Sequence, residues 1–457
     1  MQRPILLRGV IKSAGIIGLI TLLVRVISFG REVAAAAVFG VSADLDVFLI
    51  AYLVPSYLFF AILACAGAAV IPALIKARQS AGEAGLRALI GQANAAGLIG
   101  FCGLGLLAAL AGPYYLPLLT LHLTPEKAAL AQIWLPLLCL LVPLSGLAAL
   151  WTAMANAQGS LALPACVPVL TPAVTIFMLF NYAKSYGAWA FVYGVLLGAA
   201  LECVALGLIL HRRGLLIRPC FSRDADNGPV RGFAVLFTGA AIMGLIPAAD
   251  QAMAATLGTG AITGMIFGGR LVSLTGSAGA LALGTAVLPA FASLTAAMDW
   301  EGLRKLMRHC LILTFLLAFP VCLFVSWFSL PLTEIMFERG QFNSTDASRV
   351  ASVQAYYILQ IPFYLGWIVL ARVLATLGRN RILLMFSIGA ATLNVVLNSI
   401  VMQTMGAPGI AAATALVFLL LFATTYAVAH YYMPQAAKTR APAPARQPDA
   451  PGDTAPP

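Results

Sequence analysis

The sequence predicts an all-α, multi-pass membrane protein with about twelve transmembrane helices in two six-helix lobes. Three observations predict this fold. Of the 457 residues, 61% are hydrophobic and 9% are charged, whereas about a quarter of the residues in a soluble domain are charged. Apolar segments long enough to cross a bilayer, about 20 residues each, recur along the whole chain. A sequence pattern late in the second segment also returns late in the eighth.

Each expected helix is an apolar run that ends at charged, glycine or proline-containing stretches. The runs lie, in order, near residues 10–30, 46–72, 88–111, 129–154, 163–181, 187–210, 232–256, 263–291, 306–328, 350–377, 382–403 and 408–432. The first run leads into a charged segment and lacks an evident small-residue cleavage site. We therefore expect no cleaved signal peptide.

An internal repeat divides the chain. The segment 67–74, GAAVIPAL, returns as 284–291, GTAVLPAF, at an offset of 217 residues. This offset carries the second helix onto the eighth, and the even number of intervening helices gives parallel repeats, related by an axis along the membrane normal. The alternative is chance recurrence of a small–x–x–Pro pattern in Ala- and Gly-rich helices. The predicted domains are 1–211 (first lobe), 212–231 (cytoplasmic linker), 232–432 (second lobe) and 433–457 (disordered Pro/Ala-rich cytoplasmic tail).

The net charge of +11 follows the predicted topology. If both termini are cytoplasmic, most of the basic residues fall in cytoplasmic segments, as the positive-inside rule requires. The outer loops would then hold only Lys127, Lys184, Arg339 and Arg349. The excess of basic residues is therefore explained by the membrane topology. It gives no reason to expect a nucleic-acid partner.

The cysteine and histidine residues show no spacing typical of a metal or cofactor site. The eight cysteines contain no Cys-x-x-Cys pair, and the four histidines are scattered near the ends of the runs. We interpret the cysteines as small hydrophobic residues and expect neither a cofactor nor a transition-metal site.

Ionisable residues within the apolar runs are candidate functional residues, because a charge in the membrane is costly. Arg25 and Arg31 in the first run and Arg270 in the eighth flank flexible Gly-containing sequence. Three guanidinium groups from two lobes suit an anion, and the planar fork of arginine suits phosphate. We expect Glu32, Asp46 and Arg372 to be their supporting charge partners; a purely structural role for these charges is the alternative.

A second polar group lies in the other half of the chain. It comprises Asp250, Asn394, Asn398 and Thr414. Asn394 and Asn398 are four residues apart and share a helix face, and such oxygen ligands suit a hard cation such as Na⁺. The alternative is polar contact between helices.

Several motifs carry a resemblance to a known family. They are Arg25 to Glu32 (RVISFGRE), Gly269-Arg-Leu271, Leu283 to Pro289 (LGTAVLP) and Met336 to Phe342 (MFERGQF). The pattern resembles the MurJ/MviN flippases of the multidrug/oligosaccharidyl-lipid/polysaccharide (MOP) transporter superfamily. The resemblance covers nearly all the expected helices.

The resemblance implies a function in the bacterial inner membrane. The family moves lipid II, the undecaprenyl-pyrophosphate-linked peptidoglycan precursor, between leaflets; Arg25, Arg31 and Arg270 would hold the pyrophosphate. Asp250, Asn394, Asn398 and Thr414 look like the family's cation site, which implies coupling to Na⁺, H⁺ or the membrane potential. The family's arginine pair in the second helix is absent, since no charge occurs in 47–75, and family members have fourteen helices. A related exopolysaccharide unit is therefore an alternative substrate.

Two other functions compete with a flippase. A cation-coupled multidrug exporter of the same fold would need acidic residues in its cavity, whereas the first lobe has an excess of arginine. A membrane glycosyltransferase or polymerase would need acid/base carboxylates or a metal at a membrane face. The longest outer loop offers only Glu334, Glu338 and Asp346. We therefore expect a transporter and not an enzyme, with no protein partner specified.

Overall fold

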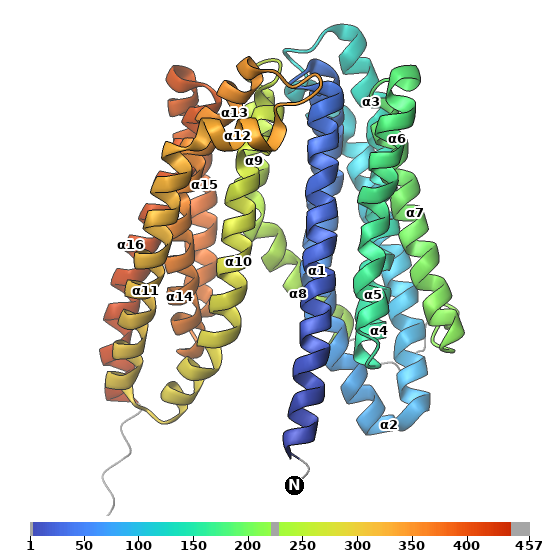
Figure 1. Cartoon of the computed structure of the whole chain (residues 1–457). Helices are drawn as coiled ribbons and strands as arrows, with labels where there is room; N and C mark the ends of the chain where they lie inside the picture. The colour runs from blue at the N-terminus through green and yellow to red at the C-terminus, as the bar shows by residue number, and fades with distance from the viewer. Residues whose placement is uncertain (1–2, 221–227, 440–457) are drawn as a thin grey trace, which may run out of the picture.

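The structure is a computed structural model that describes residues 3–220 and 228–439, and these residues form a helical bundle (Figure 1). The first half contains α1 (Arg3–Phe39), α2 (Ala43–Leu119), α3 (Pro125–Cys139), α4 (Leu141–Ala157), α5 (Ala162–Cys166), η1 (Val167–Val169), α6 (Leu170–Tyr186) and α7 (Trp189–Arg212). The second half contains α8 (Gly228–Met243), α9 (Leu245–Ala255), α10 (Ala261–Ala296), α11 (Trp300–Trp327), α12 (Ser329–Phe337), α13 (Ser344–Tyr357), η2 (Ile358–Gln360), α14 (Ile361–Thr376), α15 (Asn380–Met405) and α16 (Ala407–Thr439).

Each of the twelve predicted apolar runs lies on one helix or on consecutive helices. The long α2 holds two of them, because Ala81 and Gly82 leave the helical conformation and the chain reverses there. Gly82 has φ of 63°, which glycine adopts without steric cost. By length and composition alone, eight helices among the described residues can cross a membrane, or nine with the bent pair α8–α9; this count takes α2 once and leaves out α1 and α10. The predicted multi-pass fold is confirmed.

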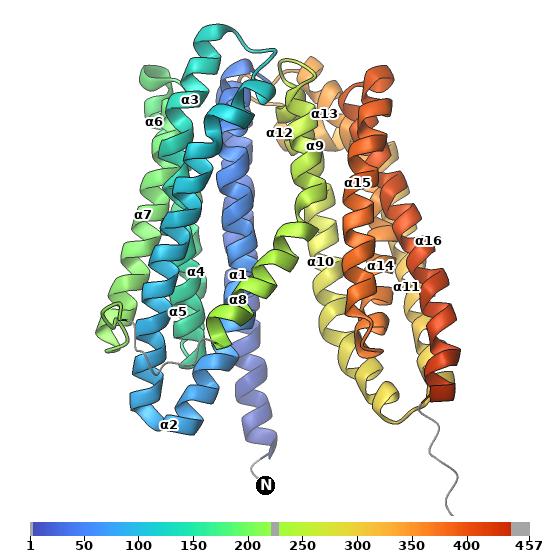
Figure 2. The ribbon, with the colours of Figure 1, turned by 180° about the vertical axis from the view of Figure 1, so that it is seen from behind.

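The helices form two lobes (Figures 1 and 2). Helices α1 to α7 make the first lobe, and α9 to α16 make the second. Helix α8 runs obliquely between them, and the α8–α9 pair is bent by 46°. The start of α1 and the end of α16 lie at the same end of the bundle, here called the terminal end; the other end is the distal end.

The boundaries predicted for the domains stay a prediction. Of the linker 212–231, residues up to Cys220 pack on the first lobe, where Cys220 N donates to Gly91 O at 3.2 Å. Residues 221–227 lie outside the described residues. Of the tail 433–457, residues 440–457 also lie outside them, and α16 continues to Thr439.

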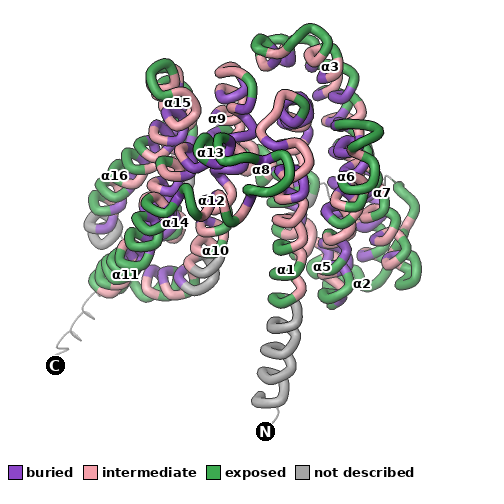
Figure 3. Tube along the Cα trace, turned by 45° about the horizontal axis from the view of Figure 1, so that its top comes forward, coloured by how far each residue is buried: buried purple, intermediate pink, exposed green. Residues whose placement is uncertain are grey.

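Burial follows the pattern expected of a bundle in lipid (Figure 3). Each lobe has an interior cluster: Leu74 is buried in the first lobe and Phe291 in the second. These two residues occupy equivalent positions in the sequence repeat. Large apolar side chains such as Trp327 and Ile335 are exposed on the outside. Lipid, which is as apolar as these side chains, covers such a surface without cost.

Candidate functional site

The candidate site lies between α1 and α10, which face one another across the lobes in opposite directions (Figure 1). Arg25 and Glu32 are seven residues apart on α1, and Arg270 and Ser277 are seven apart on α10, so each pair shares one helix face. Arg25 Nη1 donates to Ser277 Oγ at 3.3 Å, and Arg270 Nη2 lies 2.9 Å from Glu32 Oε1. Two levels of interlobe contact therefore lie about two helix turns apart.

Glu32 is the centre of the level that lies nearer the distal end, where Arg270 contacts it. Its Oε1 accepts from Arg31 Nη2 at 2.7 Å as well as from Arg270. The Glu32 side chain is 8% exposed, whereas those of Arg31 and Arg270 are 20% and 32% exposed. The Nε atoms of both arginines are buried and have no hydrogen-bond partner among the described residues. One carboxylate thus holds two guanidinium groups whose donors are not all used.

Glu202 on α7 is a further acidic residue near this level. It interacts electrostatically with Arg31, and its Oε1 accepts from Thr171 N at 3.2 Å. Three arginines and two glutamates leave an excess of one positive charge. At the level of Glu32 the two arginines are balanced by Glu32 and Glu202, so the excess comes from Arg25, which is exposed and lies about two helix turns away. The planar forks of the arginines match phosphate oxygens.

The distal end of the interface is closed by hydrogen bonds between the lobes. Asp46 at the start of α2 accepts from Thr263 Oγ1 at 2.6 Å, from Thr263 N at 3.3 Å and from Gly260 N. Beside it, Gln341 N donates to Ala37 O at 2.8 Å. We call these contacts the distal closure. Asp46 and Thr263 are 217 residues apart, which is the offset of the sequence repeat. Equivalent positions of the two lobes therefore meet here, as they do on a pseudo-two-fold axis.

The loop between α12 and α13 completes the distal closure. Gly340 has φ of 64°, and a Cβ there would collide with Ala37 O. Asp346 Oδ2 accepts from Val41 N at 3.4 Å and from Asn343 N at 3.3 Å, so one carboxylate both caps α13 and contacts the first lobe. The segment 336–342, one of the motifs that resemble the family, is thus a contact between the lobes.

Aromatic rings link α1, α10 and this loop. The Phe337 ring lies 5.9 Å from Phe29 of α1 and 5.0 Å from Phe267 of α10. Phe267 and Arg270 are three residues apart on one helix, so the rings occupy the neighbouring turn toward the distal end. Apolar packing between the lobes therefore accompanies the polar distal closure.

The predicted cation group is assembled in the interior of the second lobe. Asp250 of α9 accepts from Asn398 Nδ2 at 2.8 Å and from Thr414 Oγ1 at 2.8 Å, and Asn394 Nδ2 donates to Thr414 Oγ1 at 3.0 Å. All four residues are 0% exposed. Asn398 Oδ1 has no hydrogen-bond partner among the described residues. A carboxylate and a buried amide oxygen that accepts no hydrogen bond are suitable ligands for a hard cation.

The sequence interpretation did not identify two residues of the interlobe and Asp250 sites, and it expected two other residues beside the arginines that do not lie there. Tyr357 donates to Asp250 Oδ2 at 3.0 Å, and neither it nor Ser277 has a distinctive sequence signal. Asp46 belongs to the distal closure and is not bonded to the arginines. Arg372 is exposed on α14 and forms no ion pair or hydrogen bond with a described residue. The structure thus brings together Arg31, Glu32 and Arg270. Arg25 lies about two helix turns nearer the terminal end.

Two helical lobes related by a parallel repeat, with a buried glutamate that pairs with an arginine of each lobe, define a membrane transporter of the alternating-access class. The family model for "Lipid II flippase MurJ" matches residues 35–441. The chain therefore belongs to the MurJ family.

Individual relatives agree with this assignment. The chain is 26% identical to a "Probable lipid II flippase MurJ" from Synechocystis sp., over 89% of this chain and 79% of the relative. It is 27% identical to the "Lipid II flippase MurJ" of Burkholderia cenocepacia, over 74% and 67% of the two chains.

Solved structures share the fold. A lipid II flippase MurJ in an inward closed conformation superposes with a TM-score of 0.75 at 19% identity, covering 92% of this chain and 90% of the other. An inward-facing multidrug resistance MATE family transporter of the MOP superfamily gives 0.74 at 14% identity, covering 92% and 96%. These two likenesses establish the fold alone.

Proposed function

We propose that this chain is a flippase that moves a polyprenyl-pyrophosphate-linked saccharide between the leaflets of the bacterial inner membrane. The observation that carries the proposal is the interlobe cluster of Arg31, Glu32 and Arg270, in a chain that belongs to the MurJ family. No bond of the substrate is made or broken. The multidrug exporter remains a weaker second candidate, since only the shared fold favours it.

In this proposal the pyrophosphate binds where Glu32 now links the two arginines. Arg31 and Arg270 have Nε donors without partners, and the oxygens of a pyrophosphate would accept from them. Arg25, bonded only to Ser277 in the described residues, would add a third guanidinium from the level below. The pyrophosphate would replace the 3.3 Å bond between Arg25 and Ser277 and would accept hydrogen bonds from the unused arginine donors. The lipid chain of the substrate would stay in the bilayer.

Transport would then require the lobes to open at the distal end and to close at the terminal end. The structure has the distal closure formed, with Asp46, Ala37 and Val41 of the first lobe bonded to the second. Rocking of the lobes would break these bonds and present the bound pyrophosphate at the distal end. We place both termini in the cytoplasm, so that the distal end faces the outer leaflet. We propose the lobes as 1–211 and 232–432, joined by the linker 212–231, with the tail 433–457.

We further propose that the group around Asp250 binds Na⁺, with Asp250, Asn398 and Thr414 supplying oxygens. Sodium should then stabilise the wild-type protein against thermal unfolding, by about 2.7 kcal/mol at a hundred times its dissociation constant. Asp250→Asn should abolish the rise in melting temperature that NaCl gives relative to choline chloride. The control is Asp44→Asn, an exposed carboxylate paired with Lys127. An equal rise in both variants would exclude Na⁺ binding at Asp250.

The substrate itself is tested by replacement in cells. We expect this chain to restore growth to bacteria depleted of their lipid II flippase if lipid II is the substrate. The altered second helix, which has no charge in 47–75, leaves an exopolysaccharide repeat unit as the alternative. Failure of growth with normal membrane levels of the protein would exclude lipid II. Transport of a non-peptidyl lipid-linked saccharide by the purified protein would then support the alternative.

A further inference from the structure

Tyr52 of α2 lies beside the interlobe cluster. Asp46 of α2 and Thr263 of α10 bond to each other at the distal closure. Six residues separate Asp46 from Tyr52, and seven separate Thr263 from Arg270. These spacings are about 9 and 10.5 Å along two helices that both run from the distal end toward the terminal end (Figure 2). Tyr52 therefore lies at the depth of Arg270, on a third helix of the interface.

An aromatic stack fixes the ring of Tyr52. The ring centroid lies 5.3 Å from that of Phe48, one turn earlier on α2, with an interplanar angle of 16°. Phe48 in turn stacks on Phe191 of α7 at 4.1 Å and 12°. Phe48 and Phe191 are both buried in the core of the first lobe. Stacking on a buried ring restricts the Tyr52 side chain, so its hydroxyl is held in place before a ligand arrives.

The hydroxyl of Tyr52 lies among four charges and bonds to none of them. Tyr52 interacts electrostatically with side chains of α1, α10 and α7, namely Arg31, Glu32, Arg270 and Glu202. The hydroxyl forms no hydrogen bond with a described residue, and it keeps accessible surface, unlike the buried Nε atoms of Arg31 and Arg270. An open and unused O–H donor is therefore present at the interlobe cluster.

This donor differs from its neighbours because it is neutral. No charged residue occurs in 47–75, so α2 contributes no charge at this depth. Arg31 and Arg270 are already balanced by Glu32 and Glu202. A further arginine on α2 would be an unbalanced charge within the membrane whenever the site is empty, which is costly. A phenol adds a hydrogen-bond donor without that cost.

We propose that Tyr52 is a further substrate-binding residue, whose O–H donates to a pyrophosphate oxygen held by Arg31 and Arg270. One phosphate oxygen accepts more than one hydrogen bond, and an O–H donor forms a short, strong bond to a charged oxygen. The stacked ring supplies the direction of this bond, so little side-chain freedom is lost on binding. The inference rests on the proposed function, because its ligand is the pyrophosphate proposed for the interlobe cluster.

The test compares Tyr52→Phe with the wild type, using the purified full chain and two lipids. Undecaprenyl pyrophosphate carries the anion, whereas undecaprenol is the same chain without phosphate. Phenylalanine keeps the stacked ring and removes only the O–H. We expect Tyr52→Phe to bind undecaprenyl pyrophosphate about tenfold more weakly, the effect of one hydrogen bond to a charged group. It should bind undecaprenol as the wild type does.

Tyr115→Phe is the matched control. Tyr115 is another tyrosine of α2, its hydroxyl is buried without a described partner, and it lies near Cys139 of α3. This variant should bind both lipids with wild-type affinity. The melting temperature without lipid is a second measurement. Tyr52→Phe should unfold at the wild-type temperature, because the O–H that it lacks bonds to no described residue.

Each contrary result has a separate meaning. Wild-type affinity of Tyr52→Phe for undecaprenyl pyrophosphate would overturn the role of Tyr52, and a loss in Arg270→Ala alongside it would leave the flippase proposal intact. A lower melting temperature without lipid, or an equal loss of affinity for both lipids, would make Tyr52 a structural residue and also overturn its role. A wild type that binds undecaprenyl pyrophosphate no more tightly than undecaprenol would overturn the proposed function, and the role of Tyr52 with it.

Discussion

Replacing Arg270 with alanine is expected to abolish transport at normal protein levels. The change removes the only cross-lobe partner of Glu32 among the described residues, and it removes a guanidinium from the second-lobe side of the pyrophosphate site. A hydrogen bond to a charged group contributes about 1.5–3 kcal/mol, so losing the bond from Arg270 to the pyrophosphate should weaken binding at least about tenfold. Transport of a fluorescent lipid-linked saccharide by reconstituted protein measures the loss. Arg270→Lys should recover part of it, because lysine keeps the charge and loses the bidentate fork.

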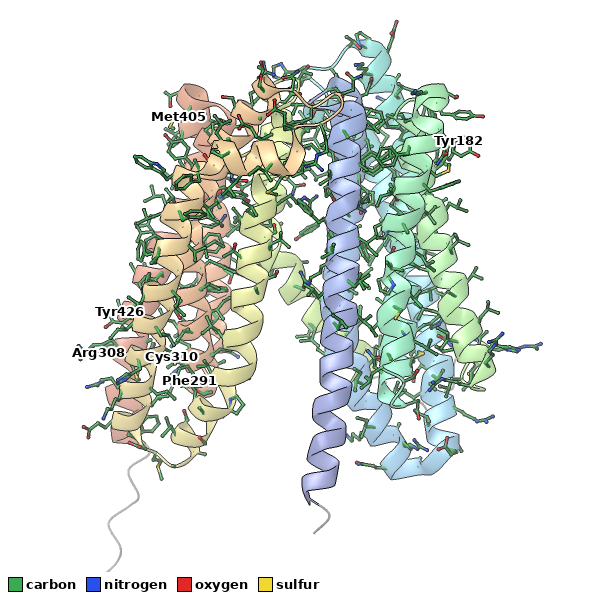
Figure 4. All side chains as sticks on the ribbon, viewed as in Figure 1. Tyr182, Phe291, Arg308, Cys310, Met405 and Tyr426 are labelled. Carbon is green, nitrogen blue, oxygen red and sulfur yellow. The ribbon has the colours of Figure 1, made fainter. Side chains whose placement is uncertain are left out.

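The matched control for this change is Arg308→Ala. Arg308 is an exposed arginine on α11, and its side chain projects outward from the second lobe, away from α1 (Figure 4). This variant should transport at the wild-type rate. Full transport by both Arg25→Ala and Arg270→Ala would contradict the anion-binding account.

Asp46→Ala is expected to open the distal closure. The Asp46 carboxylate accepts from Gly260 N, Thr263 N and Thr263 Oγ1, all in the opposite lobe. Hydrogen bonds to a charged group contribute about 1.5–3 kcal/mol each, and a loss of about 3 kcal/mol shifts the balance of two conformations by more than a hundredfold. Spin labels at Leu121 and Met405 report this shift, because both residues are exposed and lie on opposite lobes: Leu121 is between α2 and α3, and Met405 ends α15 at the distal end. Their distance should lengthen in Asp46→Ala.

Asp44→Ala is the control for the distal closure. Asp44 lies two residues earlier on the same helix and pairs with Lys127 within its own lobe at 3.2 Å. The label distance should not change in this variant. The labelled background should lack the exposed cysteines Cys102, Cys166 and Cys220. Identical distance distributions in Asp46→Ala and the wild type would show that Asp46 does not hold the lobes together.

The apolar runs and the repeat were sufficient to predict the fold. Run length determines where a helix crosses the membrane, and the repeat offset determines which helices correspond. The offset of 217 residues also links Asp46 to Thr263, although no pattern in the sequence predicted that the two would touch. Repeats identify equivalent positions, but contact across the axis depends on how far the lobes have closed.

Individual partners were predicted less well, for a physical reason. Helical spacing places Arg25 and Glu32 on one face, but the partner of each depends on the register of α10 against α1, which no local sequence feature determines. Tyr357 reaches Asp250 because α13 and α9 both pack on α10 and α16 in the second lobe. Asp46 was expected beside the arginines because it is one of the few ionisable residues within the apolar runs; in the structure it accepts from backbone N–H groups of the opposite lobe instead.

The most direct test of the central claim is transport by the purified chain in vesicles. A fluorescent undecaprenyl-pyrophosphate-linked disaccharide would be placed in both leaflets, and the fraction accessible to an external, membrane-impermeant quencher or glycosidase would be measured over time. The flippase account predicts that the protein makes nearly all of the probe accessible with its chemical structure unchanged until the reagent acts, and that Arg270→Ala leaves about half inaccessible. A wild-type protein that leaves the inner-leaflet half inaccessible, or that changes the probe chemically, would contradict it.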